Sequence, residues 1–184
     1  MKQVIDYINS LLCLKYNEEN IYGLVEIVRK TTEANKFDLF PASYSDSEYK
    51  KIESGIYHRL IQPYRQTLDP DSGCSNQLFL RQYSMRLVAI IDKSKLLNDA
   101  YQDQLISEQL TGFIEFRNNK QLSVLINADS VYTEINRVNL SREDVFKSEF
   151  SGQNFVPYNR TLISIDYTIF INGNKACLDQ CSSL

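Results

Sequence analysis

The sequence has few of the residues on which most enzyme active sites depend. Its 184 residues include one histidine, His58, six glycines and no tryptophan. A single imidazole excludes metal centres that need several histidine ligands. Six glycines leave little room for a phosphate-binding loop, and the patterns G-x-G-x-x-G, G-x-x-x-x-G-K-S/T and G-x-S-x-G do not occur. Nucleotide-dependent enzymes are therefore disfavoured.

Long apolar runs and a strong net charge are also missing. No run approaches the roughly 18 apolar residues that span a bilayer. The opening "MKQVIDYINSLLCLKY" is interrupted by Asp6, Asn9 and Ser10, unlike the core of a signal peptide. With a net charge of -3, the chain has no overall positive potential that would attract nucleic acid or an anionic membrane. We expect a protein that stays in the cytoplasm where it is made, with no membrane partner.

The four cysteines and the acidic residues form no recognisable metal or redox motif. The cysteines, at 13, 74, 177 and 181, match neither a zinc site nor a redox pair, so we expect reduced, structural thiols. Acidic pairs such as Glu143 and Asp144 lack the pattern that a two-metal site requires. We therefore expect no catalytic residue, no cofactor and no metal ligand, and interpret the chain as a protein that is not an enzyme.

Composition and periodicity predict one α+β domain over residues 1–184. Apolar residues make up 43% of the chain and charged residues 23%, the balance of a soluble globular protein. Apolar residues at helical spacing predict helices at 2–16 and 96–116. Residues 139–150 should form a polar connection with about one helical turn. Apolar and β-branched runs predict strands at 21–31, 36–44, 77–92, 121–128, 130–138 and 160–174. The expected sheet is mixed, mainly antiparallel, and packed against the N-terminal helix and the central helix.

Two of these strands carry more detailed expectations. The first two strands should form a hairpin, and the second of them should lie at a sheet edge or end near Pro41, because proline cannot donate to a ladder. The last strand alternates regularly, with a set of apolar residues on one side that should line the core beneath the central helix. That set is Ile163, Ile165, Tyr167, Ile169 and Ile171.

Residues 45–77 are the least regular stretch, and we expect an extended loop or β-arm inserted in the domain. Its polar, turn-rich ends flank "GIYHRLIQPY", and long irregular segments in compact domains are often functional. The apolar residues in its middle are the expected anchors for a partner. They are Ile56, Tyr57, Leu60, Ile61 and Tyr64.

The order of these elements resembles that of the tail-terminator and tail-completion proteins in the neck of tailed bacteriophages. The resemblance is carried by the opening "VIDYINSLL", by "SMRLVAIID" followed by "DAYQDQLISEQL", and by the final "ISIDYTIFI". It implies a structural virion protein in the tail or neck that forms a homo-oligomeric ring in the head-to-tail connector. Its partners would be copies of itself and other neck, portal or tail proteins. DNA would pass through the lumen without sequence-specific binding.

Two alternatives from other classes stay open. One is a monomeric cytosolic adaptor that binds a single soluble partner. The other is a metal-dependent hydrolase that uses surface carboxylates, which would require a pocket that joins several acidic residues around one ion.

Overall fold

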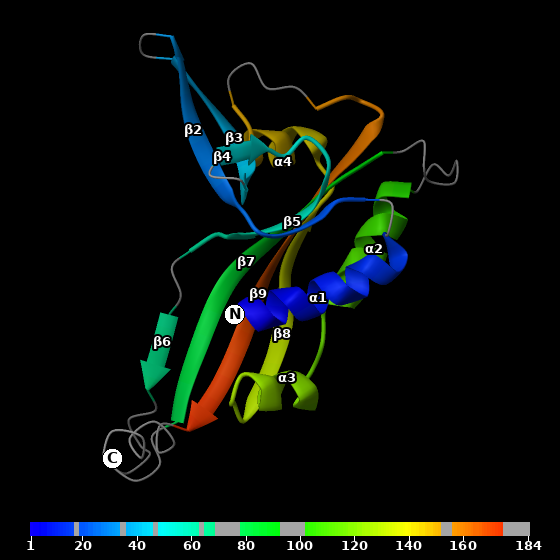
Figure 1. Ribbon diagram of the computed structural model, residues 1–184. Coiled ribbons are helices and arrows are strands. Elements are labelled where there is room, and N and C mark those ends of the chain that lie inside the picture. Colours follow the sequence, from blue (N-terminus) through cyan, green and yellow to red (C-terminus); the bar gives the residue numbers. More distant parts are fainter. Residues whose placement is uncertain are drawn as a thin grey trace.

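The computed structural model describes residues 1–16, 19–33, 36–45, 48–62, 65–68, 78–92, 102–151 and 156–174. Within these ranges the chain forms helices, a six-stranded main sheet and a three-stranded second sheet. The fold is α+β, as expected, because the helices pack on a mixed sheet in which antiparallel pairs predominate (Figure 1).

The elements largely follow the periodicity of the sequence. The helices are α1 (Lys2–Lys15), α2 (Gln102–Ile114), α3 (Lys120–Leu125) and α4 (Arg142–Glu149). The strands are β1 (Ile21–Leu24), β2 (Glu26–Glu33), β3 (Lys36–Ser45), β4 (Glu48–Lys51), β5 (Gly55–Leu60), β6 (Arg65–Leu68), β7 (Leu78–Asp92), β8 (Ser130–Asn139) and β9 (Arg160–Asn174). The helix expected at 2–16 is confirmed as α1, and the strands expected at 130–138 and 160–174 are confirmed as β8 and β9.

The long strands β7 and β9 form the spine of the main sheet. They pair antiparallel along their whole lengths, from Leu78 opposite Asn174 to Asp92 opposite Arg160. The sheet order is β1-β5-β7-β9-β8, and β6 pairs with β7 beyond the end of β5. β1 and β5 pair in parallel. Because neighbouring parallel strands need a crossover connection, the chain leaves the sheet between them, and this crossover is the second sheet, β2-β3-β4.

The strand expected at 21–31 breaks at Val25 and contributes to both sheets. β1 lies beside β5, whereas β2 pairs antiparallel with β3. Val25 is buried, and its amide donates to the carbonyl of His58 over 2.8 Å, which holds the turning point against β5. The expected hairpin is confirmed as β2 and β3, but a single strand across 21–31 is wrong.

The edge position expected from Pro41 is not found, although the pairing of β3 with β4 does end beside this residue. β3 is the central strand of the second sheet and not an edge strand. Its pairing with β4 runs from Ser45 opposite Glu48 to Ala42 opposite Lys51, and Ala42 is the residue directly after Pro41. There the Pro41 carbonyl accepts a hydrogen bond from the Ile52 amide over 2.8 Å. Proline is tolerated inside this strand because the ladder with β4 has already ended.

One face of the main sheet packs against α1, α2 and α3. The expected core set of β9, from Ile163 to Ile171, is buried there. Ile106, Leu110 and Ile114 of α2 belong to the same cluster, so the prediction that this face lies beneath the central helix is confirmed. The apolar stripe of α1 completes the layer, with Val4, Ile5, Ile8 and Leu12 buried.

The segment 121–128, expected to be a strand, forms α3 instead. Asn119 caps this helix, and its side-chain oxygen accepts a hydrogen bond from the Leu122 amide over 3.1 Å. The Asn119 amide also donates to the Val131 carbonyl, so the segment before α3 occupies the edge of β8. A short apolar run is ambiguous between helix and strand, and the cap favours the helix here.

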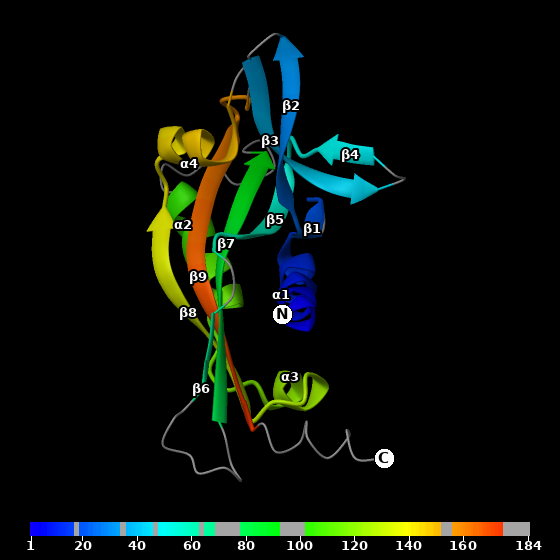
Figure 2. The same ribbon diagram turned by 90° about the vertical axis from the view of Figure 1, so that its left-hand side faces the viewer.

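The opposite face of the main sheet is covered in part by α4 and the second sheet. Residues 139–150 contain a helix of 8 residues, more than the single turn expected. Ser141 caps it, since its hydroxyl accepts a hydrogen bond from the Asp144 amide over 3.4 Å. α4 and α1 lie on opposite sides of the sheet (Figure 2). The cluster beneath α4 includes Val145, Phe40, Val88, Ile90 and Leu162.

Within the described residues, the segment 45–77 projects only in part, since β4 belongs to the β3–β4 hairpin while β5 and β6 lie in the main sheet. β5 lies inside the main sheet between β1 and β7. Gly55 is the first residue of β5 and allows the chain to pass close to Asn20. The φ angle of Gly55 is 115°, and a Cβ atom there would lie 2.2 Å from the Asn20 carbonyl oxygen. The parts that project are the β2–β3 and β3–β4 hairpins (Figure 2). Most of this projection therefore lies upstream of the expected insertion.

Candidate functional site

The five residues expected to anchor a partner do not form one exposed site. Ile56 and Tyr57 are fully buried on opposite faces of β5, each in a hydrophobic cluster of the protein's own core. Leu60 and Ile61 are half-buried, and Tyr64 lies outside the described residues. The prediction is wrong for Ile56 and Tyr57, because a strand inside the sheet uses both of its faces for the core.

Among the described residues, the acidic side chains considered for a hydrolase do not gather at one site. Glu143 and Asp144 lie in the first turn of α4, and Asp103 accepts a hydrogen bond from the Thr161 hydroxyl over 2.7 Å. In the part of the chain that the structure describes, no group of three or more histidine, cysteine, aspartate or glutamate residues could hold a metal ion.

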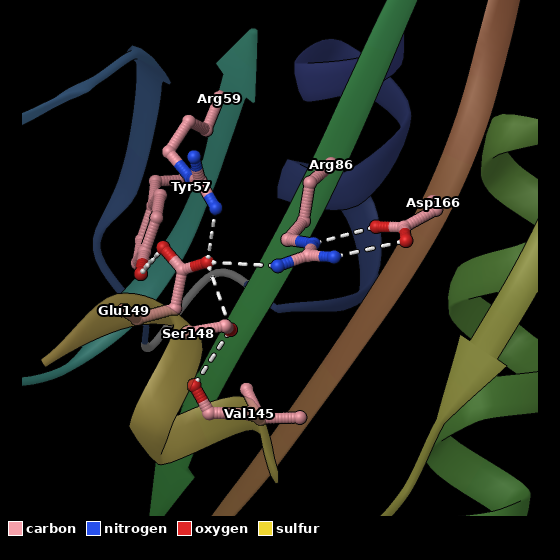
Figure 3. A network of polar contacts seen from close by, with 7 residues as sticks. All are labelled: Tyr57, Arg59, Arg86, Val145, Ser148, Glu149 and Asp166. Carbon is pink, nitrogen blue, oxygen red and sulfur yellow. Dashed lines mark hydrogen bonds and ion pairs between the residues drawn. The ribbon is translucent and has the colours of Figure 1, made fainter. Parts of the chain in front are cut away.

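Glu149 is the centre of a buried polar network where α4 meets the main sheet (Figure 3). Its side chain is fully buried and contacts two arginines, Nη2 of Arg59 at 2.8 Å and Nη1 of Arg86 at 3.3 Å. The Tyr57 hydroxyl donates to the second carboxylate oxygen over 3.0 Å. Burial, followed by the charge of Glu149, raises the pKa of Tyr57 well above its usual range. Tyr57 therefore stays protonated and serves as a donor.

Arg86 links this carboxylate to a second one on β9. Its guanidinium binds Asp166 with two hydrogen bonds, from Nε at 2.5 Å and from Nη2 at 2.9 Å. Hydrogen bonding to Asp166 is the largest of the effects that raise the pKa of Arg86. Two arginines face two carboxylates, so the network is neutral in sum, although Nε of Arg59 is buried without a hydrogen-bond partner. This arrangement is suited to fixing α4 on the sheet.

His58 is part of a second buried chain of hydrogen bonds, on the face covered by α1. Its Nδ1 atom lies 2.7 Å from the Tyr167 hydroxyl, and its Nε2 atom lies 3.0 Å from Oδ1 of Asn9. The Asn9 amide nitrogen donates to the Tyr22 carbonyl, so Oδ1 is the acceptor for His58. The proton therefore sits on Nε2, and Nδ1 accepts from Tyr167. Burial lowers the pKa of His58 to about 3, so the ring is neutral and structural.

Three exposed aromatic residues lie on the two hairpins of the second sheet. Tyr44 and Tyr49 face each other across the β3–β4 ladder, with ring centroids 5.1 Å apart, and are 65% and 51% exposed. Phe37, near the start of β3 in the β2–β3 hairpin, lies under the guanidinium of Arg29, 3.9 Å from its centroid. Exposed aromatic side chains on projecting hairpins are typical of surfaces that bind another protein.

A hollow lies at the outer side of α4, beside the segment that leads into β9. It has a volume of about 430 Å³. Its floor includes buried Val156 and half-buried Phe146, while Tyr158 on its rim is 80% exposed. Arg142 holds the segment before β9 against α4 by donating to the backbone carbonyls of Val156, Pro157 and Arg160. The hollow is therefore a built, mostly apolar surface.

The sequence analysis predicted neither the hairpin tyrosines nor this hollow. The sequence does contain a pattern that indicates the tyrosines. Tyr44 and Tyr49 flank the polar turn "SDSE", which is the pattern of aromatic residues paired across a hairpin. The hollow has no comparable signal, because Phe146 comes from α4 and Val156 from the segment beyond it.

Comparison with protein-family models and with curated sequences yields no relative. No protein-family model matches the sequence, and no curated protein sequence is significantly similar to it. None of the helices in the described ranges has the length and apolar character needed to cross a membrane.

Proposed function

We propose that this chain is a structural protein of a tailed bacteriophage. It assembles with copies of itself into a ring in the neck or tail connector, as a tail terminator or head-to-tail joining protein, and performs no catalysis. The observation that carries the proposal is the second sheet, whose two hairpins project from the body and present exposed aromatic residues. A projection of this kind is stabilised when a neighbour covers it.

The architecture supports assembly by a repeated contact. A projecting hairpin on one copy that binds a different surface on the next generates a ring if the rotation closes. The location in the neck rests on the order of elements along the chain, which resembles tail-terminator and tail-completion proteins. A net charge of -3 suits a lumen through which DNA passes without adhering to the wall.

The rigid body beneath the projection suits a static role. Both buried polar clusters, around Glu149 and around His58, connect a helix to the main sheet. Most of their charged and polar groups are bonded to one another, with the exception of Nε of Arg59. Clusters that connect helices to a sheet stabilise the fold, and their bonded side chains are not arranged as a nucleophile with its base.

Mass and shape of the purified protein test the proposal. Native mass spectrometry and electron microscopy at micromolar concentration should show a closed ring of identical subunits, and cryo-electron microscopy of source particles should place it in the neck. A chain that stays monomeric and captures one soluble host protein would establish the adaptor alternative. Metal-dependent turnover of ester or nucleotide substrates that a single carboxylate substitution abolishes would establish the hydrolase.

A further inference from the structure

We propose that the outer edge of β8 carries a binding site for a neutral carbohydrate, in which the ring of Tyr132 packs against one face of a sugar. The site is a hollow of about 490 Å³, which is within the range of small-molecule sites. It is separate from the hollow beside α4 and does not depend on the proposed ring. Around Tyr132 it is lined by the polar residues Glu115, Arg117, Asn118, Ser130 and Glu134.

The segment that joins α2 to α3 forms the outer wall of this hollow and runs beside β8 (Figure 1). Two backbone hydrogen bonds hold it against the edge of the strand. In one, the Thr133 amide donates to the Phe116 carbonyl over 3.0 Å. In the other, the Asn119 amide donates to the Val131 carbonyl over 3.1 Å. The two residues between these bonds therefore lie beside Tyr132, on a wall that is fixed before a ligand binds.

Those two residues are Arg117 and Asn118. The φ angle of Asn118 is 41°, a left-handed conformation that few residues other than glycine, asparagine and aspartate adopt. Backbone strain of this kind is concentrated at functional sites, where the surrounding contacts hold it. Here the contacts that hold it are the two hydrogen bonds to β8.

Phe170 fixes the ring of Tyr132 in place. The two rings are stacked, with centroids 4.7 Å apart and planes at 9°. Phe170 belongs to β9, on one side of β8, whereas the outer wall of the hollow lies on the other side. The ring face turned away from Phe170 therefore faces the hollow. The C–H groups on one face of a sugar carry partial positive charge, which the electron-rich face of an aromatic ring attracts.

The polar side chains around Tyr132 are not engaged elsewhere. Among the described residues, no hydrogen bond or ion pair involves the side chains of Glu115, Arg117 or Glu134. The Ser130 hydroxyl accepts a hydrogen bond from the Asn172 side chain over 3.0 Å, so its own hydrogen can donate to a ligand. Carboxylate and guanidinium groups are planar, and each can bind two neighbouring hydroxyls at once. A hydroxyl-rich ligand therefore matches these groups.

The charges of the hollow favour a neutral ligand over an anionic one. The carboxylates of Glu115 and Glu134 outnumber the single guanidinium of Arg117. Burial, followed by the charge of Glu134, raises the pKa of Tyr132, which places this carboxylate close to the hydroxyl. An anionic ligand would meet the same repulsion. Phosphate, acidic sugars and nucleic acid are therefore disfavoured, whereas an uncharged sugar incurs no such cost.

Saturation-transfer difference NMR on the full chain tests the site, because it detects the sugar protons that contact the protein, whether or not the protein assembles. The probes are glucose, galactose and mannose, each compared with its anionic uronate, at concentrations up to about 50 mM. At least one neutral sugar should bind with a Kd in the millimolar range, with the strongest transfer to the protons on one face of its ring. The corresponding uronate should bind about 10-fold more weakly.

Four variants locate the binding. Tyr132→Ala should raise the Kd for the sugar by at least about 10-fold, whereas Tyr132→Phe keeps the ring and should raise it by less than about 3-fold. Arg117→Ala removes an exposed side chain without disturbing the core, and should raise the Kd by about 5-fold. Tyr158→Ala, at an exposed tyrosine of the hollow beside α4, is the control and should leave the Kd unchanged.

The outcomes decide the site independently of assembly. Binding that Tyr132→Phe retains, and that Tyr132→Ala and Arg117→Ala weaken, supports it. Failure of all three neutral sugars to bind overturns it, as does binding that neither Tyr132→Ala nor Arg117→Ala weakens. Uronates that bind as tightly as the neutral sugars overturn the assignment to a neutral ligand.

Discussion

Nδ1 of His58 lies 2.7 Å from the hydroxyl of Tyr167, and both side chains are fully buried between the main sheet and α1. The ring bonds Asn9 of α1 through its other nitrogen. The histidine therefore ties the N-terminal helix to the middle of the sheet, and it can do so only as the neutral tautomer with its proton on Nε2.

Acid should destabilise the protein through this residue. The pKa of His58 is about 3 in the folded protein and about 6.5 in an unfolded chain. Between these values the unfolded state binds the extra proton, so stability is full above about pH 6.5 and falls as the pH decreases toward 3. The slope from this group is at most about 1.4 kcal/mol per pH unit. Urea unfolding at pH 7.5, 6, 5 and 4 measures it.

The matched variant for this experiment is His58→Gln, which keeps an amide near Asn9 but cannot titrate. Its stability should be lower than wild type at pH 7.5, and the difference should shrink as the pH falls. Carboxylates contribute to acid unfolding in both proteins and cancel in the comparison. A difference that is the same at every pH would contradict the assignment.

Removing the charge of Glu149 should loosen α4. Glu149→Gln leaves Arg59 and Arg86 largely buried without their shared carboxylate. Breaking a buried ion pair from one side costs about 3–5 kcal/mol, and urea unfolding should show this loss. Hydrogen exchange should show faster opening of α4. Glu143→Gln, in an exposed ion pair of the same helix, should leave the unfolding midpoint unchanged, and equal effects of the two variants would refute a special role for the network.

The core face of β9 should be sensitive to truncation. Ile165→Ala and Ile169→Ala empty fully buried sites, and each should lower the free energy of unfolding by about 2–5 kcal/mol. Thr168→Ala, on the other face of the same strand, should change it by less than about 1 kcal/mol. Thermal or urea unfolding of the three variants measures the contrast, and wild-type stability of the isoleucine variants would show that this face is not the core.

Substitution of two glycines tests the close approach of the chain at the start of β5, with Gly55 as the test position and Gly23 as the control. At Gly55 the backbone has φ of 115°, and an added Cβ atom would collide with the Asn20 carbonyl oxygen. Gly55→Ala should therefore destabilise by at least about 1 kcal/mol. Gly23→Ala meets no atom within 4 Å and should not lower the melting temperature. Similar melting temperatures for the two variants would show that β1 and β5 are not closely paired.

The strands and helices with long, regular periodicity were predictable, and those defined by distant contacts were not. The alternation from Ile163 to Ile171 is local and predicts both the strand and its buried face. The break at Val25 has no local signal, because a bond to His58 in a distant strand fixes it.

The partner surface was misplaced for a related reason. In "GIYHRL" apolar residues occur on both faces, which suits an exposed binding segment or a strand inside a sheet. The polar sequence around it favoured the first interpretation. Only the pairing of Tyr57 with Val88, and the burial of its hydroxyl against Glu149 from α4, decides for the second.

The parallel pairing of β1 with β5 constrains how the protein can vary. The second sheet begins where β1 ends and returns where β5 starts, and in a parallel pair these two points lie at opposite ends. A tight turn cannot replace it, because a short linker could not reach from one end of the pair to the other. Extra residues at the hairpin tips, by contrast, would extend the projection without moving either strand. The second sheet can therefore lengthen easily, but it cannot shrink below the length of chain that joins the two ends of the parallel pair.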